Sequence, residues 1–168
     1  MENLNLVLLA LHRYTASILK DTPFESIIDI DKQILIGGSE EHSNFIKRES
    51  ESPGDVKLPI LTLILGNTNS QDFELGEADG RVSFIVRMLI QADTVRQELY
   101  LSDLLRRSFN RTNINVLNEY LYNKPVLDSI ETGLTRSDKI YNYGSVVRSE
   151  RHQSIIEFEV NMDGSKFL

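Results

Sequence analysis

The chain has 168 residues, a formal net charge of −7 and no cysteine. Its content of 40% apolar and 26% charged residues is typical of one folded domain, which we expect to span residues 1–168. The negative charge argues against a general nucleic-acid binder, because phosphate contacts need a dense basic surface. The lack of cysteine excludes disulfides and cysteine-bound zinc. No stretch reaches the roughly 20 apolar residues of a membrane-spanning helix, so we expect no membrane partner.

The first third of the chain predicts a helix, a short β region and a loop. Apolar residues at three- and four-residue steps from Leu4 to Ile18 predict an amphipathic helix over about residues 2–20. The sequence "SIIDIDKQILIGG", residues 26–38, predicts one strand or two short ones, ended by two glycines. Residues 39–57, "SEEHSNFIKRESESPGDVK", are polar and charged. We expect a long mobile loop there, because so few apolar residues cannot offset the entropy lost on ordering.

The middle of the chain predicts two strands and a helix. "LPILTLILG", residues 58–66, is almost continuously apolar and predicts a central strand covered on both faces. Residues 66–80 predict a second polar loop with four acidic residues and no basic residue. In residues 81–109, "RVSFIVRMLIQADTVRQELYLSDLLRRSF", strict alternation changes to helical spacing at Thr94. Thr94 and Gln97 have the spacing of a capping box, so we predict a strand that leads directly into a helix.

The remaining residues predict strands and connections. "KPVLDSIETGLTRSDKIY", residues 124–141, has an interrupted β pattern, and "SIIEFEVNMDG", residues 154–164, alternates cleanly. The order of elements predicts an α+β domain with a mainly antiparallel β-sheet covered by two α-helices and with long polar loops. A compact apolar and tyrosine-rich cluster fits either an interface or a core under a loop. Its members are Leu117, Tyr120, Leu121 and Tyr122.

One short pattern has enzymatic potential. Asp29 or Asp31, followed later by Asp55 and Lys57 in "DVK", resembles the metal-binding pattern of restriction-type nucleases. In that pattern two carboxylates hold a magnesium ion and the lysine stabilises the attacking hydroxide. Asp55, however, follows a Pro-Gly pair in a predicted loop rather than a strand. We therefore interpret these residues as solvated charges, with a metal-dependent nuclease as the distant alternative.

No other pattern predicts catalysis or a cofactor. The three histidines have no metal-ligand spacing, and the sequence has neither a nucleophile elbow nor a phosphate-binding glycine motif. We expect no catalytic residue, no metal and no cofactor. The arginines of the second long helix predict ion-paired surface positions that match the helix dipole, rather than a nucleic-acid surface. These are Arg96, Arg106, Arg107 and Arg111.

Taken in order, the segments resemble the tail terminator (tail-completion) proteins of tailed bacteriophages and related contractile injection machines. The likeness lies in the amphipathic first helix with its short strand, the Pro-led strand "LPILTLILG", and the long strand that runs into a helix, "GRVSFIVRMLIQADTVRQELYLSDLLRRSF". A closing strand region, "RHQSIIEFEVNMD", completes it. The likeness is one of element order and pattern, and it covers most of the chain. Head–tail connector and neck proteins share much of this plan and are the alternative.

The resemblance implies a ring, usually a hexamer, on the last ring of the tail tube. Such a ring ends tube polymerisation and offers a joining surface to the head or neck. The implied partners are further copies of this chain, the tail tube protein, the sheath protein of a contractile tail, and head-completion or neck proteins. The implied location is the virion, after assembly in the bacterial cytoplasm. The resemblance implies neither catalytic residues nor sequence-specific nucleic-acid binding.

Acidic residues of the two predicted loops are the candidates for partner binding, because polar loops that order against a partner suit an assembly protein. The first loop contributes Glu40, Glu41, Glu49 and Glu51, and the second contributes Asp72, Glu74, Glu77 and Asp79.

Overall fold

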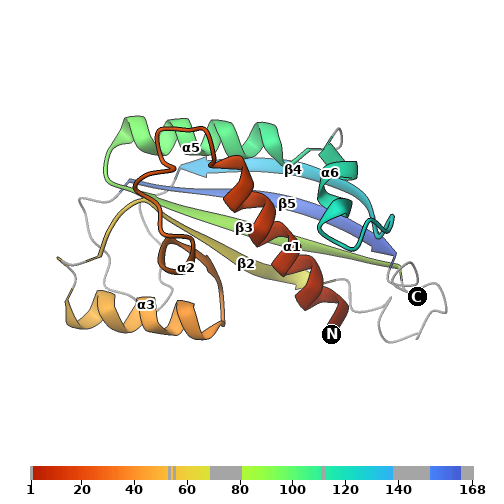
Figure 1. The fold of residues 1–168 in the computed structure, drawn as a ribbon, viewed down its shortest axis with the longest axis horizontal. Coiled ribbons are helices and arrows are strands. Elements are labelled where there is room, and N and C mark those ends of the chain that lie inside the picture. The colour runs from red at the N-terminus through yellow and green to blue at the C-terminus, as the bar shows by residue number, and fades with distance from the viewer. Residues whose placement is uncertain are drawn as a thin grey trace.

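The computed structural model describes residues 2–52, 54, 56–68, 81–110, 113–137 and 152–163. Within these residues, five strands form one sheet in the order β1-β2-β3-β5-β4. β1 pairs in parallel with β2, whereas β2–β3, β3–β5 and β4–β5 are antiparallel. The predicted α+β class with a mainly antiparallel sheet is therefore confirmed (Figure 1). The elements are α1 (Glu2–Ile18), α2 (Ile30–Gln33), β1 (Ile34–Ile36), α3 (Glu40–Glu51), β2 (Ile60–Thr68), β3 (Arg81–Ala92), α5 (Val95–Ser108), α6 (Ile114–Glu119), β4 (Leu127–Ser137) and β5 (His152–Asp163).

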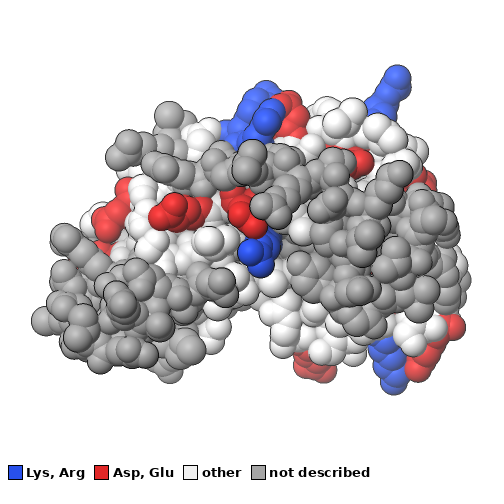
Figure 2. Space-filling model, turned by 180° about the vertical axis from the view of Figure 1, so that it is seen from behind, with Lys and Arg blue, Asp and Glu red and all other residues white. Residues whose placement is uncertain are grey.

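The two faces of the sheet differ, as the alternation along β3 predicts. Phe84, Val86, Met88 and Ile90 are at most 1% exposed and belong to the main core with residues of α1, α5 and α6. α1 and α6 lie across this face in Figure 1. On the opposite face, the Nε of Arg87 lies 3.0 Å from the Oε1 of Glu157 in the neighbouring strand β5. Figure 2 shows basic and acidic side chains close together on this side of the molecule.

The change of period at Thr94 marks the start of α5, as predicted. The Thr94 Oγ1 accepts a hydrogen bond from the backbone N–H of Gln97 at 3.1 Å, and the Gln97 Oε1 accepts one from the N–H of Asp93 at 3.0 Å. Leu101 and Leu105 are fully buried, so α5 packs its apolar side on the sheet. The strand that feeds directly into a helix is therefore a capped corner at the edge of the main core.

The basic residues of α5 are on its surface, as expected. The guanidinium groups of Arg106 and Arg107 lie 3.4 and 3.0 Å from the carboxylate of Asp103. Arg111 lies outside the described residues. Glu98 behaves differently from Asp103, because it is 5% exposed and accepts a hydrogen bond from the hydroxyl of Ser154 in β5. That contact links the first turn of α5 to the sheet.

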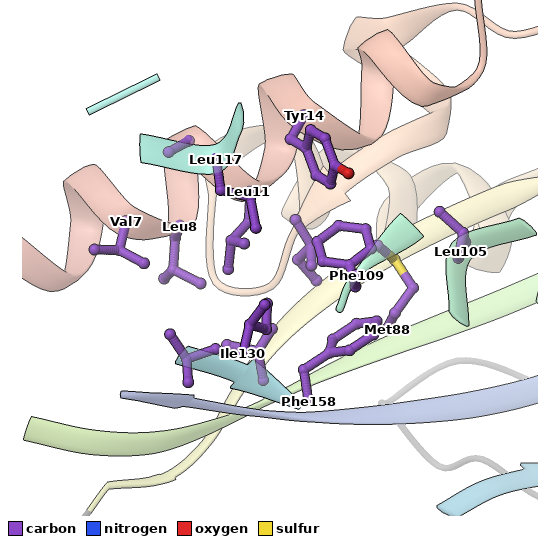
Figure 3. Close-up of a cluster of buried hydrophobic side chains, with 14 of the residues drawn as sticks. Val7, Leu8, Leu11, Tyr14, Met88, Leu105, Phe109, Leu117, Ile130 and Phe158 are labelled. Carbon is purple, nitrogen blue, oxygen red and sulfur yellow. The ribbon is translucent and has the colours of Figure 1, made fainter. Parts of the chain in front are cut away.

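Aromatic side chains join the two long helices to the sheet. The ring of Phe109, at the end of α5, lies 5.1 Å from the ring of Tyr14 and 4.5 Å from the ring of Phe158 (Figure 3). The Tyr14 hydroxyl donates a hydrogen bond to the carbonyl oxygen of Ser108 at 2.7 Å. The phenol of Tyr14 is protonated at neutral pH, and burial raises its pKa further above its usual value.

The tyrosine-rich cluster predicted around residue 120 divides between core and surface. Leu117 and Leu121 are buried, and Tyr120 packs against the core with its ring 6.2 Å from that of Tyr14. Tyr122 is 72% exposed. Most of this cluster is therefore core.

The predicted strand region of residues 26–38 is only partly a strand. The side chain of Asp29 accepts a hydrogen bond from the N–H of Asp31 at 3.0 Å and caps the short helix α2. Asp side chains often compete with strand pairing in this way. Only Ile34–Ile36 pairs with the sheet, in parallel with β2. The first half of the predicted strand was wrong for this reason.

The loop predicted over residues 39–57 was also wrong, because most of it is the helix α3. The Ser39 hydroxyl caps this helix by accepting a hydrogen bond from the N–H of His42 at 3.1 Å. Phe45 is 4% exposed and forms a second, smaller core with Leu35 and Ile60. One aromatic residue packed on the sheet thus anchors an otherwise polar helix.

Candidate functional site

A cavity of about 470 Å³ lies between α2, α3 and the segment that leads into β2. This volume is within the range of about 300–1,000 Å³ that is usual for ligand-binding sites. Its lining combines isoleucine and valine side chains with charged and amide groups. The lining residues are Ser26, Ile27, Ile28, Asp29, Lys32, Gln33, Arg48, Val56, Lys57 and Ile60.

The buried amide of Gln33 holds two walls of the cavity together. Its Oε1 accepts a hydrogen bond from the N–H of Asp29 at 2.7 Å, and its Nε2 donates one to the carbonyl oxygen of Pro59 at 3.0 Å. Gln33 is 3% exposed, so these bonds are shielded from water. They fix α2 relative to the start of β2, and the packing of Phe45 fixes α3 against the same part of the sheet.

The cavity is positively charged in an acidic protein. Lys32 of α2, Arg48 of α3 and Lys57 before β2 line it, and all three are exposed. Among the described lining residues Asp29 is the one carboxylate, so those residues together carry a formal net charge of +2. Part of the Asp29 side chain is occupied in capping α2. The cavity can therefore bind a ligand that carries an anionic group next to an apolar group.

The cavity brings together only part of the nuclease-like pattern. Asp29 and Lys57 line it, whereas Asp31 lines a separate cavity of about 130 Å³ together with His12 and Glu41. Asp55 lies outside the described residues. In the part of the chain that the structure describes, no group of three or more His, Asp or Glu side chains is placed to hold a metal ion.

Two of the three histidines, His12 and His42, make local hydrogen bonds. The Nε2 of His12 lies 2.8 Å from the carbonyl oxygen of Ile34, which links α1 to β1. The Nδ1 of His42 accepts a hydrogen bond from the N–H of Gly38 at 3.2 Å. Burial lowers the pKa of His42, which favours the neutral ring that can accept this bond. His152 is the first residue of β5.

Four of the eight acidic candidates for partner binding lie in the described residues, and three of these four are on the surface. Glu40, Glu41 and Glu51 are exposed on α3. Glu49 is only 1% exposed, so its assignment to a partner-binding surface was wrong. The reason is its position one helical turn after Phe45, on the side of α3 that packs inward. The other four candidates, Asp72, Glu74, Glu77 and Asp79, lie outside the described residues.

No protein-family model and no curated protein matches the chain. Within the described residues, none of the helices has the length and apolar character needed to cross a bilayer. The protein is therefore an α+β domain with a cationic cavity beside the start of β2.

The packing of α3 can be tested with Phe45→Ala. We expect trypsin to cleave the wild-type protein slowly after Lys47 and Arg48, because the helix must open locally before the protease can bind its backbone. The truncation removes the aromatic anchor and should speed this cleavage by at least about tenfold. The matched control is Asn44→Ala, which changes the exposed neighbouring residue and should leave the cleavage rate unchanged. Rapid cleavage of the wild type at these sites would contradict a docked α3.

Proposed function

We propose that this protein is a structural subunit of a virion that forms a ring on the end of the tail tube. The ring ends tail polymerisation and provides the surface to which the head or neck joins. The observation that carries the proposal is the order of elements around the sheet. An amphipathic helix and a short strand are followed by a Pro-led apolar strand, then by a long strand that turns at a cap into a helix, and then by closing strands.

The rigidity of the sheet suits a scaffold for assembly. β3 and β5 pair in register along twelve residues, from Arg81↔Asp163 to Ala92↔His152. Helices on both faces shield the two cores. A subunit that must hold its neighbours in fixed geometry needs such a stiff frame, because closed symmetric assemblies tolerate little variation in contact angle.

Apolar side chains on the outer side of α5 support a role in assembly. Val95 and Leu99 lie one turn apart and are 51% and 60% exposed, and the adjacent Tyr100 is 44% exposed. Exposed apolar side chains that gather on one surface mark contact sites with other proteins. Further copies of this chain, the tube protein and, in a contractile tail, the sheath protein are the candidates for this contact.

The test is to image the purified protein by negative-stain electron microscopy and then to add it to growing tail tubes. We expect rings with an open centre that bind tube ends and stop elongation. The variant Leu99→Glu should remain folded and weaken ring formation or tube binding, whereas Arg13→Glu, an exposed change on α1, should alter neither.

Two other outcomes identify the alternatives. Rings that bind a portal complex and leave tube growth unaffected indicate a connector or neck subunit. Magnesium- or manganese-dependent cleavage of DNA that is lost in Asp29→Ala indicates a nuclease, for which the shared cavity of Asp29 and Lys57 is the supporting observation. Protein that forms no rings and binds neither tubes nor portal contradicts the structural role.

A further inference from the structure

We propose that the cationic cavity receives the acidic segment of a neighbouring copy of this chain, residues 69–80, so that subunits join head to tail. The inference deepens the proposed function, on which it rests, by naming the contact that builds the ring. It starts from two features of opposite charge that the fold places at opposite ends of β2. One is the cavity, and the other is the acidic segment, which joins the sheet at Thr68 and Arg81.

The cavity and the segment are chemically complementary. Lys32, Arg48 and Lys57 come from three different parts of the fold and meet at one cavity whose lining also includes Ile27 and Ile60. The twelve residues 69–80, "NSQDFELGEADG", contain four carboxylates, two large apolar residues and no basic residue. Carboxylates bound by lysine and arginine form charge-assisted hydrogen bonds, which are stronger than neutral ones. The apolar side chains of the segment match the apolar part of the lining.

The two points where the segment joins the sheet, together with the length of the segment, exclude a contact within one subunit. β2 begins beside the cavity at Ile60 and ends at Thr68, so its nine residues separate the cavity from the segment by about 26 Å. β3 starts at Arg81 at that same far end, beside the end of β2 (Figure 1). A residue in the middle of the segment is six residues from either attachment point and reaches at most about 20 Å. The segment therefore cannot fill the cavity of its own subunit.

Opposite charges at opposite ends predict a head-to-tail contact. The exposed residue Asp128, near the start of β4, adds negative charge at the same end of the sheet as the segment. Met162 of β5 pairs with Val82 at the start of β3 on one side and with Leu127 at the start of β4 on the other, so β3 and β4 start at the same end. When two identical subunits join through two different surfaces, the pair still has one free copy of each surface. Further subunits can add in the same way, and the chain of subunits closes into a ring if the rotation between neighbours allows it. The same charge pattern opposes the reversed, like-to-like contact.

The test is a charge swap. One variant reverses the cavity with Lys32→Glu, Arg48→Glu and Lys57→Glu. The second reverses the segment with Asp72→Lys, Glu74→Lys, Glu77→Lys and Asp79→Lys. Each variant alone should associate at least about 100-fold more weakly than the wild type in sedimentation velocity at low salt, because like charges then meet at every contact. A one-to-one mixture should assemble again, since each cavity then meets a segment of opposite charge. A variant with both sets of reversals should also assemble.

A matched control separates this contact from a general effect of charge. Arg13→Glu, Lys20→Glu and Arg96→Glu reverse three exposed residues outside the cavity and change the net charge by the same amount as the cavity variant. We expect this control to assemble as the wild type does. Circular dichroism confirms that each variant is folded before assembly is compared.

The outcomes separate this contact from the proposed function. If both reversed variants form rings as the wild type does, the proposed contact is overturned and the proposed ring function is unaffected. Wild-type protein that neither forms rings nor binds tubes overturns the proposed function. The one-to-one mixture of the two reversed variants then tests the contact by itself. Association of the mixture, with neither variant associating by itself, supports the contact. A mixture that stays monomeric overturns it.

Discussion

Val86→Asp should prevent the domain from folding. Val86 is fully buried in the middle of β3, where Leu65 of β2 and Phe158 of β5 are its partners in register. None of the buried residues that the structure describes is a cation, so a carboxylate at this position would be unpaired, and an unpaired buried charge costs several kcal/mol. That is comparable with the total stability of a small domain, about 5–15 kcal/mol. Circular dichroism and size-exclusion chromatography of the purified variant measure the effect.

The neighbouring residue gives the control. Arg87 points to the opposite face, where its side chain is 38% exposed and pairs with Glu157. Arg87→Gln removes an exposed ion pair and should cost at most about 1 kcal/mol. Thermal unfolding should therefore separate two substitutions that are adjacent in sequence. Equal losses of stability would contradict the assignment of Val86 and Arg87 to different faces.

Elements with a strong period were predictable from the sequence. The alternation of β3 and the helical spacing of α5 come from a single buried face in each element, and the pair Thr94 and Gln97 fixes the boundary between them. β5 follows the same rule, because alternate residues from Ile156 to Met162 enter the core. In each of these elements the apolar residues that recur with a regular spacing are the ones that enter the core, so the spacing in the sequence predicts the buried face.

α3 was missed because its composition is that of a loop and its packing depends on few residues. Ser39 and the acidic residues Glu40 and Glu41 were the available signal, since a capping hydroxyl followed by negative charge is typical of a helix start. The decisive contact, Phe45 against Leu35 and Ile60, joins segments that are distant in sequence. No local pattern reveals such a contact.

The cavity could not be predicted for the same reason. Lys32, Arg48 and Lys57 share no motif, and they meet only because Gln33 links α2 to the start of β2 and Phe45 holds α3 on the sheet. Two residues of the nuclease-like pattern, Asp29 and Lys57, line one cavity. The pattern grouped them with Asp31 because it assumed a strand, and the short helix α2 places Asp31 at a different cavity.

Phe109→Ala should cause a large loss of stability in a protein that still folds. Phe109 is fully buried between Tyr14 of α1 and Phe158 of β5, with ring centroids 5.1 and 4.5 Å away. Truncation leaves a cavity where α1, α5 and the sheet meet, and we expect the free energy of unfolding to fall by about 3–5 kcal/mol. Tyr14→Phe keeps all three rings and removes the hydroxyl, which hydrogen-bonds to the Ser108 carbonyl and to the Asn113 side chain, so it should cost about 1 kcal/mol. Urea denaturation measures the free energy of unfolding of both variants. A loss below about 1 kcal/mol in Phe109→Ala would mean that neighbouring side chains fill the space left by the ring without cost. The aromatic contacts would then not be what holds the helices to the sheet.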